Sequence, residues 1–162
     1  MDSEFTIRPM LPSDERKLRE IVALSFSRFM GFFAVHSLLS EEGQVLVTDV
    51  DGTSIGFAKQ IEFQICGSKY GCLLWIAVHP NFRQRGFALA LANASIQQLR
   101  REGAKTVFAS TQRRNKAALA TLSKAGFERA SFFILWRLFK WRTFELYKNI
   151  WLAPGEVVLI NR

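Results

Sequence analysis

Apolar and polar residues along the chain fall into short runs typical of strands and longer segments with helical spacing. Leu18, Ile21 and Val22 recur as on one face of a helix, and Asp51-Gly52 is typical of the tight turn in a β-hairpin. Gly103 follows the longest helical pattern, as expected at a helix C-terminus. Strands are therefore predicted at residues 5–8, 44–50, 54–65, 72–78, 105–110, 128–138 and 157–160, and helices at 13–26, 26–39, 84–101 and 115–124.

The order of these elements favours a mixed α+β sheet. Antiparallel hairpins come first and a strand–helix–strand–helix–strand series follows, so helices should flank a mostly antiparallel sheet of six to seven strands. The chain of 162 residues has no Pro-, Ser- or Gly-rich linker and no internal repeat, and it is long enough to bury a substantial core. Residues 1–162 are therefore predicted to form a single domain.

Charge is distributed unevenly along the chain. Residues 1–80 carry a net −3 and residues 81–162 a net +11, which together give the formal charge of +8. A basic second half suits an anionic ligand, nucleic acid or an anionic membrane surface, although solvated Lys and Arg on helix faces account for part of the excess. With 49% hydrophobic and 22% charged residues, the composition excludes a disordered chain.

Two cysteines, Cys66 and Cys72, lie on either side of a predicted turn. They favour two free thiols in a reducing cytosol over a disulfide hairpin, and neither stands at metal-ligand spacing from another Cys or a His. The opening Met-Asp-Ser-Glu is acidic and lacks the apolar core of a secretory signal, and no apolar stretch is long enough to span a bilayer. We therefore expect a cytoplasmic protein without a metal site.

Residues 76–88 have the sequence of an anion site: a strand, then a basic loop, then a helix N-terminus. The apolar run ends at Val78, and Gly86 lets the backbone approach a ligand without a Cβ in the way. Arg83 and Arg85 add positive charge and forked donors suited to phosphate oxygens. This order predicts a site for a di- or polyphosphate group that is held largely by main chain.

The same residues resemble the acetyl-CoA pyrophosphate loop of the GCN5-related N-acetyltransferase (GNAT) family. The likeness rests on Val78-His79-Pro80 followed by Arg83-x-x-Gly86-x-Ala88. A second block, from Asn115-Lys116-Ala117-Ala118 to Lys124-Ala125-Gly126-Phe127, is similar to the later helix of the family and its Gly-Phe turn. The resemblance covers roughly residues 70–130. It implies a GNAT-like fold with a V-shaped splay between the fourth and fifth strands, where CoA lies.

The resemblance also implies a role for the residues of these two blocks. Acetyl-CoA would be the cosubstrate, with its thioester carbonyl on the backbone N–H of Val78 and its pyrophosphate on the main chain of residues 83–88. The side chain of Asn115 would reach the pantetheine arm, and it can also cap the helix that follows. The cofactor-binding residues expected on this basis are Ala77, Val78, Arg83, Gln84, Arg85, Gly86, Phe87, Ala88, Asn115 and Ala118.

The usual acid and base of the family are missing. Many members carry a Glu base on the fifth strand and a Tyr acid on the later helix, and counting from the motifs places Ser110 and Leu122 there. Glu62 on the preceding hairpin strand and His36 in the aromatic helical segment are the remaining candidates for the base. A solvated Glu62 and a packed His36 are the alternatives, and water can relay protons in the absence of either group.

Aromatic residues gather where the family forms its acceptor site, in the first helices and between the last two strands. The first group lies at residues 26–33 and the second at residues 132–151, where basic residues interleave the aromatic ones. A bulky or apolar acceptor, or a homodimer sealed by the second group, would use these surfaces. A membrane surface or an acidic partner would also suit the second group.

Three functions are compatible with these features. The first is an N-acetyltransferase that transfers an acetyl group from acetyl-CoA to a primary amine by direct attack. The second is an acyl-CoA-binding regulatory protein of the same fold with little or no turnover, which Ser110 and Leu122 favour. The third is a basic interaction domain for nucleic acid or membrane, in which the Gly loop is incidental, and it lacks any recognisable nucleic-acid motif. The acceptor stays open among a small amine, a lysine side chain and a protein N-terminus.

Overall fold

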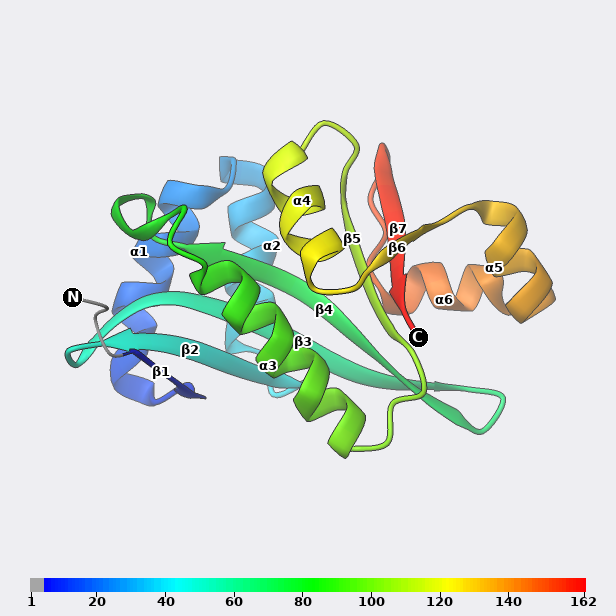
Figure 1. The fold of residues 1–162 in the computed structure, drawn as a ribbon, viewed down its shortest axis with the longest axis horizontal. Coiled ribbons are helices and arrows are strands. Elements are labelled where there is room, and N and C mark those ends of the chain that lie inside the picture. The colour runs from blue at the N-terminus through cyan, green and yellow to red at the C-terminus, as the bar shows by residue number, and fades with distance from the viewer. Residues whose placement is uncertain (1–4) are drawn as a thin grey trace. The chain divides into compact units, whose positions relative to one another are not determined.

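Seven strands of the computed structural model, which describes residues 5–162, form one mixed sheet in the order β1-β2-β3-β4-β5-β7-β6 (Figure 1). The strands are β1 (Phe5–Pro9), β2 (Gln44–Val50), β3 (Thr53–Ile65), β4 (Ser68–Val78), β5 (Val107–Gln112), β6 (Glu128–Ala130) and β7 (Glu156–Asn161). The helices are α1 (Glu15–Ser25), α2 (Arg28–Leu39), α3 (Phe87–Arg101), α4 (Lys116–Lys124), α5 (Phe132–Phe139) and α6 (Thr143–Asn149), with 3-10 turns η1 (Pro12–Asp14), η2 (Pro80–Phe82) and η3 (Lys140–Arg142). The acidic start of the chain, residues 1–4, lies outside the described residues.

The strand pairing confirms the mixed, mostly antiparallel sheet. β1, β2 and β3 pair antiparallel in order, and β7 pairs antiparallel with both β5 and β6. β4 and β5 form the parallel pair, in which Gly71–Leu73 lies beside Val107–Ala109. This pairing covers three residues of each strand, although β4 continues to Val78 and β5 to Gln112. The short parallel ladder agrees with the splay predicted between the fourth and fifth strands.

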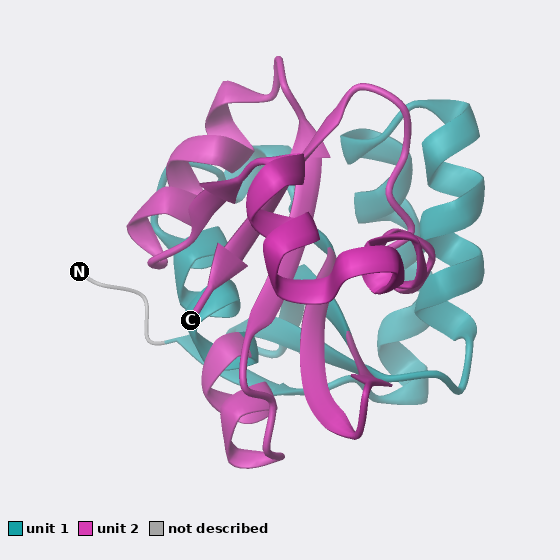
Figure 2. Cartoon of the chain, turned by 90° about the vertical axis from the view of Figure 1, so that its right-hand side faces the viewer, with its two compact units in different colours: residues 1–60, 75–95 teal, residues 61–74, 96–162 magenta. Residues whose placement is uncertain are grey.

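Unit 1 of the chain (residues 1–60 and 75–95, teal in Figure 2) contains β1, β2 and the first part of β3. Neighbouring residues of a strand point to opposite faces of a sheet, so the contacts of Phe57 and Gly56 show what covers each face of β3. Phe57 is fully buried in the core that α1 and α2 form, whereas a Cβ on Gly56 would lie 3.4 Å from Leu91 of α3. Within unit 1, α1 and α2 therefore cover one face and the start of α3 covers the other.

Unit 2 (residues 61–74 and 96–162, magenta in Figure 2) has its own core around Phe108 of β5. Leu135 of α5 and Leu146 of α6 are fully buried in this core. The segment between the last two strands is thus folded onto the sheet through one side of each helix. The single domain expected for the whole chain stays a prediction beside this division into two units.

The predicted strand at residues 128–138 is wrong beyond residue 130. β6 ends at Ala130, and the Oγ of Ser131 then caps α5 by accepting a hydrogen bond from the N–H of Ile134 at 3.3 Å. Almost every residue of Phe132–Phe139 is apolar, and a continuous apolar run has no periodicity that separates a buried strand from a helix. The pattern also did not predict α6. The other predicted elements are present, with ends displaced by a few residues.

Candidate active site

The loop between β4 and α3 presents a row of backbone N–H groups without partners. Among the described residues, the N–H groups of Gln84, Arg85 and Gly86 have no hydrogen-bond acceptor. The row continues into the first turn of α3, where N–H groups have no carbonyl of their own helix to bind. Such a row attracts anions, and the positive end of the helix dipole adds to the attraction. This geometry in unit 1 fits the predicted di- or polyphosphate site, which stays a prediction.

Two residues of this loop have left-handed backbone conformations. The φ angle is 62° at Gln84 and 84° at Gly86, and left-handed residues occur in the concave N–H arrangements that bind anions. A Cβ at Gly86 would meet no protein atom within 4 Å, so glycine is needed for the conformation and not to avoid crowding. Gln84 holds the same kind of conformation with a side chain, which stores strain at the site. No pattern in the sequence predicted the left-handed conformation of Gln84.

Arg83 secures the loop to its own unit. Its Nε donates to the backbone oxygen of Val78 at 2.9 Å, and its Nη2 donates to Oγ of Ser25, at the end of α1, at 2.9 Å. The guanidinium of Arg83 was predicted to bind phosphate, but two of its nitrogens donate to protein oxygens instead. Arg85 is exposed, with its guanidinium carbon 5.5 Å from the ring centre of Phe82, and its charge is available to a ligand.

His79 positions the loop entrance. Its Nδ1 accepts a hydrogen bond from the N–H of Asn81 at 3.3 Å, and its Nε2 lies 3.5 Å from Oε1 of Glu20 on α1. The pKa of Glu20 is lowered, chiefly by the hydrogen bond from Lys17 and also by His79. These contacts give His79 a structural role at the start of η2.

β4 contains one residue more than the facing part of β3. The two-residue turn Cys66-Gly67, with φ angles of 52° and 73°, places Ile65 opposite Ser68. At the other end, the N–H of His79 donates to the oxygen of Ile55 at 2.8 Å. The chain advances eleven residues from Ser68 to His79 but only ten from Ile55 to Ile65. This difference of one residue indicates a β-bulge in β4, a feature common beside active sites.

Two hydrogen bonds show the direction of the Val78 peptide groups. Because the N–H of His79 points to β3, the N–H of Val78 points away from β3. The oxygen of Val78 points the same way, since it accepts from Arg83 of the loop. The backbone N–H of Val78 is thus directed out of the β3–β4 ladder, as the predicted contact with a thioester carbonyl requires.

The residues of the second block lie in unit 2. Asn115 caps α4, since its Oδ1 accepts from the N–H of Ala118 at 3.1 Å, and its role toward the pantetheine arm stays a prediction. Leu122 is 3% exposed and belongs to the core. Ser110 donates to Oε2 of Glu156 on the neighbouring strand β7 at 2.8 Å. A carboxylate thus lies against the position where many family members carry a Glu.

Glu156 is a residue that sequence reasoning missed. Its Oε2 accepts from Ser110 and also from the N–H of Ala153, at 3.1 Å, and both contacts fix the carboxylate in place. The contact with Ser110 depends on the antiparallel register of β5 and β7, in which Ser110 faces Val158. The one available signal was an acidic residue at the start of a strand in a strongly basic half of the chain.

The two base candidates proposed from the sequence have different surroundings. Glu62, in unit 2, forms an ion pair with Lys69 (Oε2 to Nζ 2.9 Å), and its Oε1 is buried without a partner among the described residues. His36, in unit 1, is exposed on α2. The histidine is therefore not packed in a core, and Glu62 retains an acceptor oxygen that no protein group uses.

The model of the family described as "Acetyltransferase (GNAT) family" matches residues 11–127. The chain belongs to this family. The resemblance that the phosphate loop (residues 83–88) and the Gly-Phe block (residues 115–127) indicated is confirmed. The acetyltransferase is an acyl-CoA-dependent N-acyltransferase. A comparison with curated proteins gives no match.

Solved structures share the fold of this acetyltransferase. The ribosomal-protein-S18-alanine N-acetyltransferase from Escherichia coli is 20% identical with a TM-score of 0.67, over 98% of this chain and 93% of that one. The PaiA N-acetyltransferase from Thermoplasma acidophilum, in complex with coenzyme A, is 14% identical with a TM-score of 0.70, over 98% and 99%. A fungal multi-domain GH3 β-N-acetylglucosaminidase has a GCN5-related glucosamine N-acetyltransferase region that is 16% identical with a TM-score of 0.69. That match covers 81% of this chain but 18% of the fungal one.

The phosphate loop fits acetyl-CoA as the cosubstrate of the acetyltransferase. The unpartnered N–H groups of Gln84, Arg85 and Gly86 suit the oxygens of a pyrophosphate, and Arg85 adds positive charge. When bound, acetyl-CoA supplies an activated thioester. The loop N–H groups would hold its phosphates, and the N–H of Val78 would face its thioester carbonyl.

Proposed function

We propose that this acetyltransferase transfers the acetyl group of acetyl-CoA to a primary amine by direct attack on the thioester. The observation that supports this most strongly is the combination of the phosphate loop with the outward N–H of Val78 at the end of the same strand. One element would hold the cosubstrate by its phosphates and also stabilise its reacting carbonyl. No covalent enzyme intermediate is needed.

The chemistry requires one neutral amine and two proton movements. The amine nitrogen forms a bond to the carbonyl carbon, and the carbonyl oxygen gains negative charge that the N–H of Val78 stabilises. The C–S bond then breaks, the nitrogen loses a proton, and the CoA thiolate takes one up. A positioned base contributes about 10²–10⁴-fold to such a reaction, and water can carry the proton to it.

Three side chains are candidates for the base. Glu62 is supported by its buried, unpartnered Oε1, and His36 by its exposed imidazole on α2. Glu156 is supported by its contact with Ser110, the residue that stands where the base is usual in the family. Of these, Glu156 is the carboxylate whose position is best fixed, and we assign it the role of base ahead of the other two.

We also propose an acceptor with a bulky or apolar part next to its amine. Phe29 and Phe32 on α2 are 72% and 70% exposed, and Phe33 is 39% exposed. Three adjacent aromatic rings on the surface of a single helix favour contact with an apolar group over solvent. A panel of amines that differ in apolar bulk tests this through their KM values.

A second candidate is an acyl-CoA-binding regulatory protein with little or no turnover. The observation that favours it is the buried position of Leu122, which leaves no proton donor at the place of the usual Tyr. The two candidates share the cosubstrate site and differ in acetyl transfer alone.

Thermal unfolding with acetyl-CoA is the first test, with ATP and NAD as anionic controls. Ligand at 100 times its dissociation constant should add about 2.7 kcal/mol of stability. Stabilisation by acetyl-CoA alone, followed by CoA release with amines, supports the transferase. If acetyl-CoA stabilises the protein but no amine leads to release of CoA, the result supports the regulatory protein. An equal response to all three ligands, or none, contradicts both.

A cytosolic location is a further part of this proposal. Cys66 and Cys72 are both free thiols, as expected in a reducing compartment. Fractionation of cells that express the chain tests the location.

A further inference from the structure

The segment from α5 through η3 to α6 (residues 131–151) is apolar on its outer side as well as on its core side. Leu135 and Leu146 are fully buried in the core of unit 2. A large group of exposed apolar side chains normally marks a surface that contacts a partner or a membrane. The large apolar side chains left exposed are Phe132 (53%), Phe133 (74%), Leu138 (57%), Trp141 (77%), Phe144 (59%) and Trp151 (40%).

Aromatic and basic side chains share the outer face of both helices. On α5, Phe133 is followed four residues later by Arg137, and on α6, Phe144 is followed four residues later by Lys148. Residues four apart lie on the same side of a helix, and all four of these side chains are exposed. Each helix therefore presents a ring and a cation side by side to the solvent.

The charges of this segment are mostly uncompensated. Four basic residues stand against one acidic residue in positions 131–151. Within the described residues, the acidic one, Glu145, pairs with Arg142 at 3.0 Å, and no acidic partner is present for Arg137, Lys140 or Lys148. A surface that covers this segment should accordingly be negative as well as apolar.

We propose that the α5–η3–α6 segment docks on a lipid bilayer surface that is rich in anionic headgroups. Exposed Trp and Phe side chains enter the boundary between headgroups and acyl chains, and Lys and Arg contact the anionic headgroups. Among residues 5–162, no helix has both the length and the apolar character needed to cross a membrane.

A second copy of the chain is the other occupant expected from the sequence. A two-fold interface places the same patch on both subunits, so the uncompensated cations of one copy would face those of the other. Charges of one sign repel across such a contact, whereas an anionic bilayer attracts them. Charge thus favours the bilayer. This docking is independent of acetyl transfer, and its test needs no activity measurement.

The test is flotation of the full chain with two kinds of vesicle, phosphatidylcholine alone and phosphatidylcholine with phosphatidylglycerol. We expect binding to the second kind, and weaker binding in high salt. The double variant Phe133→Ser with Trp141→Ser should bind at least about tenfold more weakly. Arg137→Gln with Lys148→Gln should lose about fivefold for each charge at low salt. Phe144→Ser provides a second apolar variant on a different helix.

Matched variants elsewhere on the surface separate this patch from general stickiness. Phe29→Ser with Phe32→Ser removes two rings of similar exposure from α2. Arg101→Gln with Lys124→Gln removes the same charge from exposed positions outside the segment. Both controls should float as the unchanged chain does, and thermal unfolding should show all variants folded.

Three results would overturn the proposal. The first is no flotation with either kind of vesicle. The second is flotation that the control pairs reduce as much as the segment variants do. The third is a dimer in light scattering that Phe133→Ser with Trp141→Ser converts to a monomer while vesicle binding is absent. That last result would assign the patch to a second copy of the chain.

Discussion

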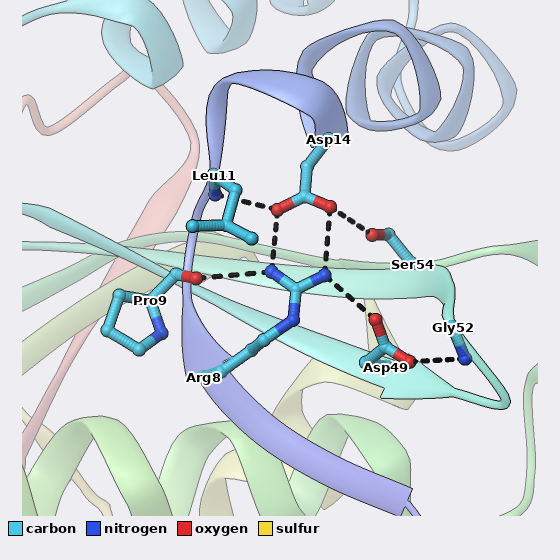
Figure 3. A network of polar contacts seen from close by, with 7 residues as sticks. All are labelled: Arg8, Pro9, Leu11, Asp14, Asp49, Gly52 and Ser54. Atoms are coloured by element: carbon cyan, nitrogen blue, oxygen red, sulfur yellow. Dashed lines mark hydrogen bonds and ion pairs between the residues drawn. The ribbon is translucent and has the colours of Figure 1, made fainter.

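Arg8 and Asp14 meet in a two-point contact, with Nη1 2.7 Å from Oδ2 and Nη2 3.0 Å from Oδ1 (Figure 3). Nη2 of Arg8 also lies 2.8 Å from Oδ2 of Asp49 on β2. Asp14 in turn accepts from the N–H of Leu11 and from Oγ of Ser54 on β3, each at 2.7 Å. This cluster connects β1, η1, β2 and β3. The cluster fixes the start of α1 to the sheet. The last residue of the same helix, Ser25, accepts the hydrogen bond from Arg83.

Asp14→Asn should lower the free energy of unfolding by about 1–3 kcal/mol, because it removes the charge from a buried, fully hydrogen-bonded carboxylate. The hydrogen bond from Arg8 holds the pKa of Asp14 well below its usual range. A lowered pKa contributes stability above the ordinary value near about 4, and this contribution is lost as pH falls through the folded value. Urea unfolding should therefore separate the two proteins at neutral pH and bring them together in acid.

Glu15→Gln is the matched control for this prediction. Glu15 pairs with Arg19 on the exposed side of α1 at 2.8 Å, and exposed pairs contribute little to stability. A difference between Asp14→Asn and the unchanged protein that persists unaltered at low pH would contradict the assignment of the effect to the carboxylate.

Gly86→Ala should weaken acetyl-CoA binding at least about tenfold, because a Cβ disfavours the left-handed conformation and stands where the phosphates approach. Gly67→Ala is the control, since Gly67 has a φ of 73° in a hairpin turn and, like Gly86, no protein atom within 4 Å of its Cβ position. Both variants should lose about 1 kcal/mol of stability from backbone strain. Only Gly86→Ala should change the dissociation constant measured by calorimetry.

Gln84→Gly tests whether the loop binds by its main chain. Removing the side chain relieves the strain of a φ of 62° and leaves the N–H groups in place. Binding of acetyl-CoA should be unchanged within a factor of about two, with stability equal or slightly higher. A large loss of binding would mean that the Gln84 side chain, rather than the backbone, contacts the ligand.

Local sequence was sufficient to predict the place of the loop between β4 and α3. Gly86, Arg85 and the end of the strand at Val78 lie within nine residues, and their roles depend on backbone geometry that neighbouring residues set. The helix N-cap at Asn115 was predictable for the same reason, since its side chain bonds to a residue three positions later.

Contacts between distant parts of the chain were not predictable in this way. Arg83 reaches Ser25 across 58 positions, and Ser110 reaches Glu156 across 46. Each depends on which elements become neighbours, which no short pattern records. The strand prediction for residues 131–138 was wrong for a different reason. An apolar run fits a strand and a helix equally well, and the N-cap at Ser131 favours the helix.

The two thiols should differ sharply in reactivity. Cys66 is exposed in the β3–β4 turn, whereas Cys72 is buried, and burial raises the pKa of its thiol. The thiolate is the reactive form, so Cys72 should stay unreactive even in mildly alkaline solution. Titration with a chromogenic disulfide should modify one thiol per folded chain and two in urea. A Cys66→Ser variant that still reacts quickly when folded would contradict the burial of Cys72.

Glu156→Gln should reduce kcat by about 10²–10⁴-fold if Glu156 is the base, because the amide cannot take up the amine proton. Stabilisation by acetyl-CoA should be unchanged, since Glu156 contacts Ser110 and Ala153 rather than the phosphate loop. Ser110→Ala should have a smaller effect on kcat, because it removes one hydrogen bond and leaves the carboxylate.

Glu62→Gln and His36→Asn complete this comparison of the three candidate bases. Both variants should retain kcat within about tenfold of the unchanged protein. Whichever of the three variants lacks the base should also lose the acidic limb of the pH–rate profile. A normal kcat for Glu156→Gln together with a large loss for Glu62→Gln would move the role to Glu62. Full activity in all three variants would leave water as the proton acceptor, with catalysis arising from the position of the amine against the thioester.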